Sequence, residues 1–387
     1  MLPPARSRVV AQYVHNYLPL TEGWIADQIR FLRSFRSVVL TFRCVGDPHV
    51  DVEGVVSLAD APQPARAWNG AMRTFRGWAP LHAAASREHS VSLIHAHFGD
   101  RALQAIPLAK AVGVPLVTSF YGRDMWRSEG GVDALRRRYA PLFAAGDLFL
   151  AEGPAARQRL LDIGCPPERA RIHPIGVDLS KIPFIPRAVA PGEPFRLLMA
   201  ARFVEKKGLE YGLRAFSVIA AKHSNVTMTV VGDAGRSSDE LKVKERLLEI
   251  ARESPAPERI RFVGFVPKEQ FLEIARDHHV LVQPSVTASD GDSEGGFPVA
   301  MTELAAAGMP IIATRHCDIP ELVIEGETGW LADERDVDAL VAAIADALRN
   351  PELVTRRGES ARKRVEEHYD GRRTTLDEIY RSVLEHA

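Results

Sequence analysis

Residues 290–310, "DGDSEGGFPVAMTELAAAGMP", place three acidic residues and two glycines directly before an expected helix. Pro298 suits the first helical turn and Gly308 suits the position just past the last turn, so a helix is expected over about 298–307. The preceding run "VLVQPSV" (280–286) is typical of a short buried strand. A buried strand, a glycine-rich loop and a helix form the unit from which ligand-binding parallel sheets are built.

The same alternation of short β-rich runs and helical segments continues along the chain. The β-rich runs lie at 8–14, 37–43, 92–98, 114–121, 147–153, 171–177, 195–202, 226–233, 259–266, 279–286, 310–316 and 329–333. Such alternation predicts parallel sheets covered by helices on both faces. It is interrupted once, at 184–194, where prolines and a glycine indicate a linker.

We therefore expect an α/β protein with two doubly wound domains. The expected N-terminal domain covers 1–185, the linker 186–194 and the second domain 195–366. The terminal segment 367–387 carries one apolar helical stripe, which must pack on another part of the chain. Ligands are expected at the carboxyl ends of the strands, in a cleft between the domains.

Composition favours a soluble enzyme. Of the 387 residues, 46% are hydrophobic and 26% are charged, and no apolar run reaches the length of a membrane span. The N-terminus lacks the apolar core of a signal peptide, and three scattered cysteines without a CxxC motif favour a reducing compartment. We therefore expect a cytoplasmic protein without a disulfide framework or a zinc site.

The charge is divided unevenly. Residues 1–190 carry 23 Lys and Arg against 16 Asp and Glu, whereas the remainder carries 26 against 34. A basic half suits anionic lipid or phosphate, although solvated helix faces such as 135–140 give the same excess.

The quoted stretch predicts an anion site. The helix N-terminus offers free N–H groups, and Gly295 and Gly296 leave no side chain between the backbone and a ligand. Glu294 lies at the rim of this site, where a carboxylate can accept hydrogen bonds from hydroxyl groups. Glu303 lies inside the helix among apolar residues and needs a partner there, for which the vicinal diol of a ribose would serve.

A second stretch, "ARFVEKKGLE" (201–210), follows the first strand of the second domain. Arg202 ends that strand and Lys207 precedes a glycine and a helix, so two cations are placed where they suit a diphosphate leaving group. The alternative is a solvated basic turn in which Glu205 pairs with either cation. No GxGxxG follows a strand and no GxxxxGK[ST] occurs, so dinucleotide and Walker sites lose their main support.

Together with "EGGFPVAMTELAAAGMPIIAT" (294–314), this stretch resembles the retaining GT-B glycosyltransferases of family four, also called glycosyl transferases group 1. The resemblance covers most of the second domain. Within the family, the sequence is most similar to exopolysaccharide and colanic-acid type transferases. The resemblance implies two Rossmann-like domains facing a central cleft, with the C-terminal helix crossing back to the N-terminal domain. It also implies a nucleoside diphosphate sugar, such as a UDP-sugar, as donor, with no metal and no other cofactor.

The resemblance also implies residue roles. The donor-binding set is Gly23, Arg202, Lys207, Glu294, Gly295, Gly296, Phe297, Pro298 and Glu303. The catalytic set is Arg202, Lys207, Glu294 and His97, and the acceptor-side set is Glu22, Tyr121 and Asp124. Three departures stand out. Eight residues instead of the usual seven separate Glu294 from Glu303, and Tyr121 stands where the family often has histidine. The phosphate loop reads "TEGW" (21–24) where paired glycines are common, which is why Glu22 is counted on the acceptor side.

Several of these residues have structural alternatives. His97 ends a strand, and its ring can be satisfied locally instead of serving the acceptor. Asp124 can cap the helix that follows it. The adjacent residues His316, Cys317 and Asp318 rarely converge on one metal ion, so no metal site is expected there.

The acceptor is expected to be a saccharide, and a lipid-linked one if the segment 66–78 contacts a membrane. That segment places Trp68, Met72, Phe75 and Trp78 among three arginines, which suits the inner face of a cell membrane, although a packed helix with solvated arginines explains it too. Nucleic acid is not expected as a partner. Two alternatives to a polysaccharide transferase remain: another GT-B enzyme, such as a sugar-nucleotide epimerase or a small-molecule glycosyltransferase, and a non-catalytic nucleotide-sugar binder.

Overall fold

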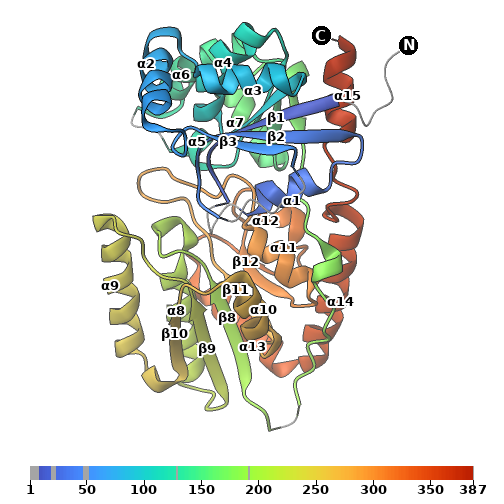
Figure 1. The fold of residues 1–387 in the computed structure, drawn as a ribbon. Coiled ribbons are helices and arrows are strands. Elements are labelled where there is room, and N and C mark those ends of the chain that lie inside the picture. The colour runs from blue at the N-terminus through green and yellow to red at the C-terminus, as the bar shows by residue number, and fades with distance from the viewer. Residues whose placement is uncertain (1–7, 19–22, 47–51, 128–129, 191, 387) are drawn as a thin grey trace. The chain divides into compact units, whose positions relative to one another are not determined.

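The computed structural model describes residues 8–18, 23–46, 52–127, 130–190 and 192–386. The chain divides into two compact units (Figure 1). The first unit contains the described residues up to Gly176 together with those from Gly371 onward, and the second runs from Val177 to Asp370.

The first unit is built on a seven-stranded parallel sheet with the order β3-β2-β1-β4-β5-β6-β7. Its strands are β1 (Arg8–Tyr17), β2 (Phe35–Cys44), β3 (Gly54–Ser57), β4 (Val91–His97), β5 (Leu116–Ser119), β6 (Leu148–Ala151) and β7 (Ala170–Ile172). Six of these seven strands match the expected runs. The edge strand β3 was not expected, because its only apolar residues are Val55 and Val56 and acidic residues flank the segment on both sides.

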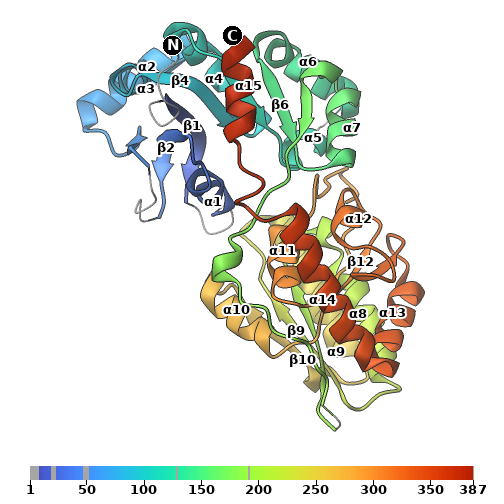
Figure 2. The ribbon, with the colours of Figure 1, turned by 90° about the vertical axis from the view of Figure 1, so that its right-hand side faces the viewer.

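Helices cover both faces of this sheet (Figure 2). They are α1 (Trp24–Arg30), α2 (Gln63–Arg76), α3 (Pro80–Glu88), α4 (Gly99–Val112), α5 (Arg123–Trp126), α6 (Gly131–Ala145), α7 (Pro154–Asp162) and α15 (Asp377–His386). One face packs on α3, α4, α6 and α7, and the opposite face packs on α1 and α15. Strands buried on both faces account for the continuous apolar runs of the sequence.

Helix α15 confirms the expectation that the terminal segment packs on the first domain. Leu376, Tyr380 and Val383 join a cluster that contains Leu93 and Val117 of the sheet. The chain rejoins the first unit at Gly371, four residues later than the expected boundary at 367.

The second unit is built on a six-stranded parallel sheet with the order β10-β9-β8-β11-β12-β13. Its strands are β8 (Phe195–Ala200), β9 (Val226–Val231), β10 (Ile260–Gly264), β11 (Val280–Gln283), β12 (Ile311–Thr314) and β13 (Gly329–Ala332). Its helices are α8 (Leu209–Ala220), α9 (Ser238–Glu253), α10 (Lys268–Arg276), α11 (Val299–Ala306), α12 (Ile319–Leu322), α13 (Val337–Arg349) and α14 (Pro351–His368). Helices α8, α9 and α13 pack on one face, and α10, α11, α12 and α14 on the other.

The boundary between the units corrects the expected one. The described residues of the segment 177–194, which was expected to end the first domain and then form a linker, belong to the second unit. Ile182 lies in the core of that unit, and the buried Arg187 guanidinium donates to the carbonyls of Ala275, Arg276, His278 and Ala307. An arginine with this many partners fixes a segment whose prolines suggest a free linker.

Candidate active site

Three loops meet at the carboxyl ends of adjacent strands in the second unit. Strands β8, β11 and β12 are neighbours in the sheet and run parallel, so the loops 201–208, 284–298 and 315–318 leave the same edge. Ligands of open α/β sheets bind at this edge. The loops contain the residues that the sequence analysis assigned to the donor.

Gly208 allows two of these loops to pack directly on each other. Its φ is +59°, and a Cβ atom added to it would lie 1.8 Å from the carbonyl oxygen of Pro284. The backbone N–H of Val286 donates to the carbonyl of Lys206 at 2.8 Å. The close approach therefore requires glycine at position 208.

The central contact of the site joins Lys207 to Glu294. Lys207 Nζ lies 2.6 Å from Glu294 Oε2, and the Ser285 hydroxyl donates to Glu294 Oε1 at 2.7 Å. Only 4% of the Glu294 side chain is exposed. Burial alone would raise the pKa of Glu294, but the charges of Lys207 and Lys206 outweigh it and hold that pKa below its ordinary value.

The longer spacing before α11 does not remove Glu294 from the site. Gly295 adopts a φ of +89°, a conformation that glycine reaches without strain. The helix begins at Val299, with Pro298 as the N-cap residue, and ends at Ala306, so the expected range is correct within one residue at each end. The ring of Phe297 packs against Tyr369, 5.3 Å between centroids, within the second unit.

Arg202 is held by a carboxylate that the sequence analysis did not identify. Its Nε and Nη2 atoms donate to the two carboxylate oxygens of Glu240, at 2.8 and 2.5 Å. The Arg202 hydrogen bond is the main cause of the lowered pKa of Glu240. The bidentate pair fixes the plane of a guanidinium whose side chain is half exposed.

Glu303 is buried on α11 and lies 2.5 Å from Lys268 Nζ, at the start of α10. The pairing gives the carboxylate the partner that its burial demands. The carboxylate thus lies on α11 and is paired with a cation. This helix begins directly after the loop 284–298, which we call the donor loop because it contains most of the residues expected to bind the donor.

Glu205 does not pair with Arg202 or Lys207, which corrects the alternative of a self-paired basic turn. Its carboxylate accepts hydrogen bonds from the backbone and hydroxyl of Ser289, at 2.8 and 2.6 Å. Lys206 contacts the same loop through Asp292, at 3.2 Å, and the carbonyl of Ser293. Both residues therefore hold the loop in which Glu294 lies.

A buried hydrogen-bond chain supports the donor loop from β12. His316 Nδ1 lies 2.6 Å from Glu334 Oε1, and its Nε2 lies 3.0 Å from the Ser293 hydroxyl and 3.3 Å from the Glu294 nitrogen. The Cys317 thiol lies 2.8 Å from the same hydroxyl, and burial raises its pKa to about 11. Sequence reasoning tested His316 only as a metal ligand and missed this role. Among the described residues, no three His, Cys, Asp or Glu side chains are grouped as metal ligands.

In the first unit, His97 is fully buried and both of its ring nitrogens have partners. Its Nδ1 lies 2.8 Å from the Tyr121 hydroxyl and its Nε2 lies 3.0 Å from Gln12 Oε1. Burial lowers its pKa to about 3, so the ring is neutral near pH 7. These contacts favour the structural alternative for His97. His95 is buried beside it, with its Nδ1 2.7 Å from the Tyr380 hydroxyl of α15.

Asp124 is buried and binds backbone amides. Its two oxygens accept hydrogen bonds from Gly99 at 2.8 Å and from Tyr121 at 3.0 Å. Burial raises its pKa to about 6, against the lowering effect of those amides. Its carboxylate therefore caps α4 rather than the helix that follows it.

Gly23, the N-cap residue of α1, has open space around it: a Cβ atom added there would meet nothing within 4 Å. Glu22 lies outside the described residues.

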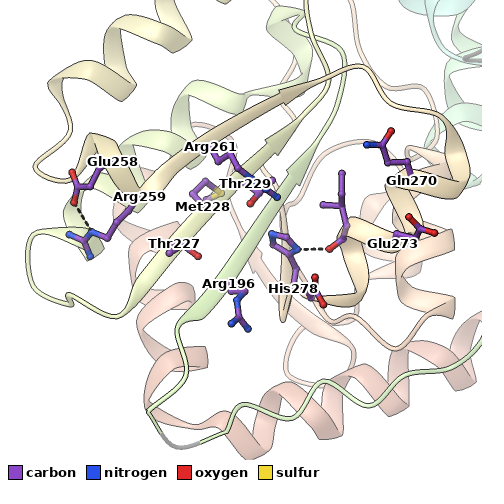
Figure 3. Close-up of a pocket in the computed structure, with 12 residues that line it drawn as sticks. Arg196, Thr227, Met228, Thr229, Glu258, Arg259, Arg261, Gln270, Glu273 and His278 are labelled. Carbon is purple, nitrogen blue, oxygen red and sulfur yellow. Dashed lines mark hydrogen bonds and ion pairs between the residues drawn. The ribbon is translucent and has the colours of Figure 1, made fainter.

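A separate pocket of about 600 Å³ lies in the second unit near the amino ends of β8, β9 and β10 (Figure 3). It is lined in part by Arg196, Thr227, Arg261 and His278, and contains none of the donor-loop residues. We therefore do not assign the donor to it.

Comparison with known proteins gives the class. The model of glycosyl transferases group 1 matches residues 182–364, and that of glycosyltransferase family 4 matches residues 27–181. The chain therefore belongs to the group 1 glycosyltransferases, and its two parallel-sheet, Rossmann-like units are those of the GT-B fold.

The curated relatives include WcaL of Salmonella typhimurium, a glycosyltransferase provisionally assigned to colanic acid biosynthesis, which is 33% identical over 69% of this chain and 64% of its own length. The amylovoran biosynthesis glycosyltransferase AmsK of Erwinia amylovora is 30% identical over 68% of this chain and 62% of its own length. The chain thus spans less than two thirds of these relatives.

Solved structures share the fold over nearly the whole chain. A sucrose-phosphate synthase from Thermosynechococcus elongatus has a TM-score of 0.76 at 18% identity, covering 98% of this chain and 100% of that one. HepE of Anabaena, solved with UDP and glucose, has a TM-score of 0.74 at 18% identity, covering 97% and 98%. In the described part of this chain, none of the helices has the length and hydropathy that a membrane span requires.

Proposed function

We propose that this chain is a retaining, metal-independent glycosyltransferase that moves a hexose from a nucleoside diphosphate sugar to a saccharide in surface polysaccharide synthesis. The observation that carries the proposal is the buried pair of Lys207 and Glu294, at the sheet edge and directly before α11. The pair places a cation for a phosphate next to an acceptor for sugar hydroxyls. The polysaccharide assignment is supported by the similarity to WcaL, assigned to colanic acid biosynthesis, and to AmsK, assigned to amylovoran biosynthesis.

Each side of the pair has a defined task in this proposal. Lys207 and Arg202 neutralise the charge that grows on the leaving diphosphate, the task that a divalent ion performs in metal-dependent transfer. The lowered pKa of Glu294 keeps its carboxylate ionised near pH 7, so it accepts hydrogen bonds from hydroxyls of the donor sugar and does not act as an acid. Glu303, with Lys268 beside it, binds the ribose diol.

Retention follows, in this proposal, from attack on the same face as the departing phosphate. Glu294 is engaged by Lys207 and Ser285, which makes it a poor nucleophile for a covalent glycosyl intermediate. His97 is neutral, buried and fully bonded, which makes it a poor general base. The leaving phosphate oxygen is then the group that takes the proton from the acceptor hydroxyl.

We propose a lipid-linked acceptor because of helix α2. This 14-residue helix buries only Asn69, while Trp68 and Phe75, two turns apart, are 58% and 85% exposed. Arg66, Arg73 and Arg76 lie on the same helix. Exposed aromatic residues among arginines suit the surface of an anionic membrane. In the alternative, a packed helix with solvated arginines, these two aromatic side chains would be buried.

Donor binding is tested by thermal unfolding with UDP, GDP, ADP, TDP and their sugar conjugates, with and without EDTA. A ligand of the folded state stabilises it by about 2.7 kcal/mol at a hundredfold excess over Kd. We expect one nucleoside diphosphate to raise Tm irrespective of EDTA, and Lys207→Ala to abolish the shift. Lys222→Ala, on an exposed residue, is the matched control. No shift with any nucleotide, or an equal shift in Lys207→Ala, contradicts the donor site.

Mechanism is tested by proton NMR of the sugar released during slow donor hydrolysis. Retention predicts that the first anomer formed has the configuration of the donor. Inversion would contradict the proposed mechanism while leaving donor binding intact. Conversion of the intact donor to an epimer, or binding without any turnover across an acceptor panel, would favour the epimerase or the non-catalytic binder.

A further inference from the structure

A pocket of about 710 Å³ in the first unit contributes to neither the donor site nor the α2 surface. Its lining includes Phe98, Asp100, Arg101, Arg123, Arg127 and Arg138. Its volume is that of a small-molecule site, and four guanidinium groups line it.

The pocket lies at the point of the first sheet where ligands of open α/β folds bind. Strands β1 and β4 are neighbours, although β2 and β3 lie between them in sequence, so the strand order changes direction there. Val14, His15 and Asn16 come from the end of β1, and Phe98 directly follows β4. A crevice outside the carboxyl ends of two such strands is a topological switch point.

Cations dominate the charge of this pocket. Arg101 comes from the first turn of α4, Arg123 from α5 and Arg138 from α6, so three separate helices each direct a guanidinium to one cavity. Within the described parts of the chain, neither Arg101 nor Arg123 has a hydrogen-bond or ion-pair partner for its side chain. Two unpaired guanidinium groups in one cavity suit an oxyanion, which each can bind through two parallel hydrogen bonds.

The two carboxylates of the pocket are already engaged. Asp100 lies 2.6 Å from Arg138 and accepts a hydrogen bond from the Tyr139 hydroxyl at 2.8 Å. Asp124 accepts from two backbone amides. Neither carboxylate is bonded to Arg101 or Arg123, and the four guanidinium groups outnumber the two carboxylates.

Phe98 gives the pocket an apolar wall. Its ring packs edge-on against Tyr121, with centroids 4.9 Å apart. Its φ of +74° is strained for a residue other than glycine. Strained residues persist where the surrounding structure fixes them, and they gather at ligand sites. An apolar ring beside guanidinium groups matches a ligand with a carbon framework and one anionic substituent.

We infer that this pocket binds the glycosyl acceptor through an oxyanion that the acceptor carries, a carboxylate or a phosphate, held by Arg101 and Arg123. The identification of the ligand as the acceptor rests on the proposed function. The oxyanion site itself is inferred from the geometry of the first unit alone. Such an oxyanion site would distinguish this chain from a transferase that recognises its acceptor through neutral hydroxyl groups alone.

The test is calorimetric titration of the full chain with three probes: glucuronate, glucose 1-phosphate and neutral glucose. We expect one or both anions to bind, glucose to bind at least tenfold more weakly, and the anion affinity to fall with added salt. Arg101→Gln and Arg123→Gln should each weaken anion binding about tenfold, since each removes a charge-assisted contact. Binding of glucuronate alone indicates an acidic sugar, and binding of glucose 1-phosphate alone indicates a phosphorylated acceptor.

The matched control is Arg137→Gln, an exposed arginine next to Arg138 that does not line the pocket. Equal binding of glucose and the anions, or an equal loss in Arg137→Gln and Arg123→Gln, overturns the inference. Nucleoside diphosphate binding should be unchanged in all three variants. If anion binding is present but no nucleotide binds, the donor proposal fails while the oxyanion site stands.

Discussion

The ammonium group of Lys207 and the carboxylate of Glu294 form an ion pair of 2.6 Å in which both side chains are largely removed from water. Removing one partner leaves the other charge buried alone. We expect Lys207→Met to lower the free energy of unfolding by about 3 kcal/mol at pH 7, and Lys207→Met/Glu294→Gln to recover most of it. Urea unfolding measures both. Equal stability of the two variants would mean that the pair is solvated.

The same pair predicts a pH dependence. The folded-state pKa of Glu294 lies below its unfolded value of 4.5, so the stability from this group is present above that value and is lost as pH falls through the folded pKa. Without Lys207, burial dominates and raises this pKa. The stability gap between the wild type and Lys207→Met should therefore narrow from pH 7 to pH 4. Denaturant unfolding at the two pH values checks this, and a constant gap would contradict it.

Asp124 contributes to the pH dependence of stability in the opposite direction. Its folded pKa of about 6 exceeds the unfolded value of 3.8, so the folded state binds more protons and stability falls as pH rises between these values. The difference between a pKa of about 6 and one of 3.8 corresponds to about 3 kcal/mol of unfolding free energy. Asp124→Asn should lack this decrease, which is visible as a wild-type minus variant difference in unfolding free energy from pH 4 to pH 7. A flat difference would mean that Asp124 is not desolvated.

Two glycines test backbone constraint against ligand contact. Gly208→Ala should lower the free energy of unfolding by about 3 kcal/mol or more, because the added Cβ would lie 1.8 Å from the Pro284 carbonyl oxygen. Gly23→Ala meets no atom within 4 Å and should change stability by less than about 0.5 kcal/mol. Thermal unfolding separates the two. A donor affinity that falls in Gly23→Ala without a stability change would support the expected role of Gly23 at the phosphate.

His316 positions the donor loop without touching the donor in this proposal. His316→Gln should lower kcat/KM about tenfold or more, because the support of Ser293 and Glu294 is lost. Glu334→Gln, which weakens the partner of His316, should cause a smaller fall in the same direction. Glu359→Gln, on an exposed residue of α14, is the control. Unchanged kcat/KM in His316→Gln would mean that the hydrogen bonds from Glu334 through His316 to Ser293 have a structural role only.

Membrane contact through α2 is tested by sedimentation with vesicles of anionic lipid. Trp68→Ser/Phe75→Ser should reduce binding without loss of stability, since both side chains are exposed. Phe265→Ser, also on an exposed aromatic residue but in the second unit, should bind as the wild type does. Equal binding of both variants would remove α2 from the membrane proposal.

Local pattern predicted the fold well, because each strand and helix has its own period and its own end signals. The helix after the donor loop begins at Val299, one residue from its expected start, since proline and glycine fix its ends. The short strand β3 and the packing of 177–194 were missed. Strand β3 contains only two apolar residues, and the partners of Arg187 lie about 90 to 120 residues away in the sequence.

The sequence pointed to the residues of the proposed donor site but not to the side chains that pair with them. The sequence pointed to Arg202, Lys207, Glu294 and Glu303, while their partners Glu240 and Lys268 carried no local signal. His97 illustrates the reverse case. A histidine at a strand end can face solvent or the interior, and only the side chains of Gln12 and Tyr121 decide between the two.

The chain leaves the first unit after Gly176 and returns to it only at Gly371. During synthesis the ribosome therefore releases the whole second unit before α15 can cover Leu93, Val117 and their neighbours. The second unit is one continuous segment and can fold as it emerges, whereas the first must wait with part of one apolar sheet face, the part that α1 does not cover, still exposed. A truncation before Asp377 should thus act as an assembly defect of the N-terminal sheet, seen as aggregation of newly made chains.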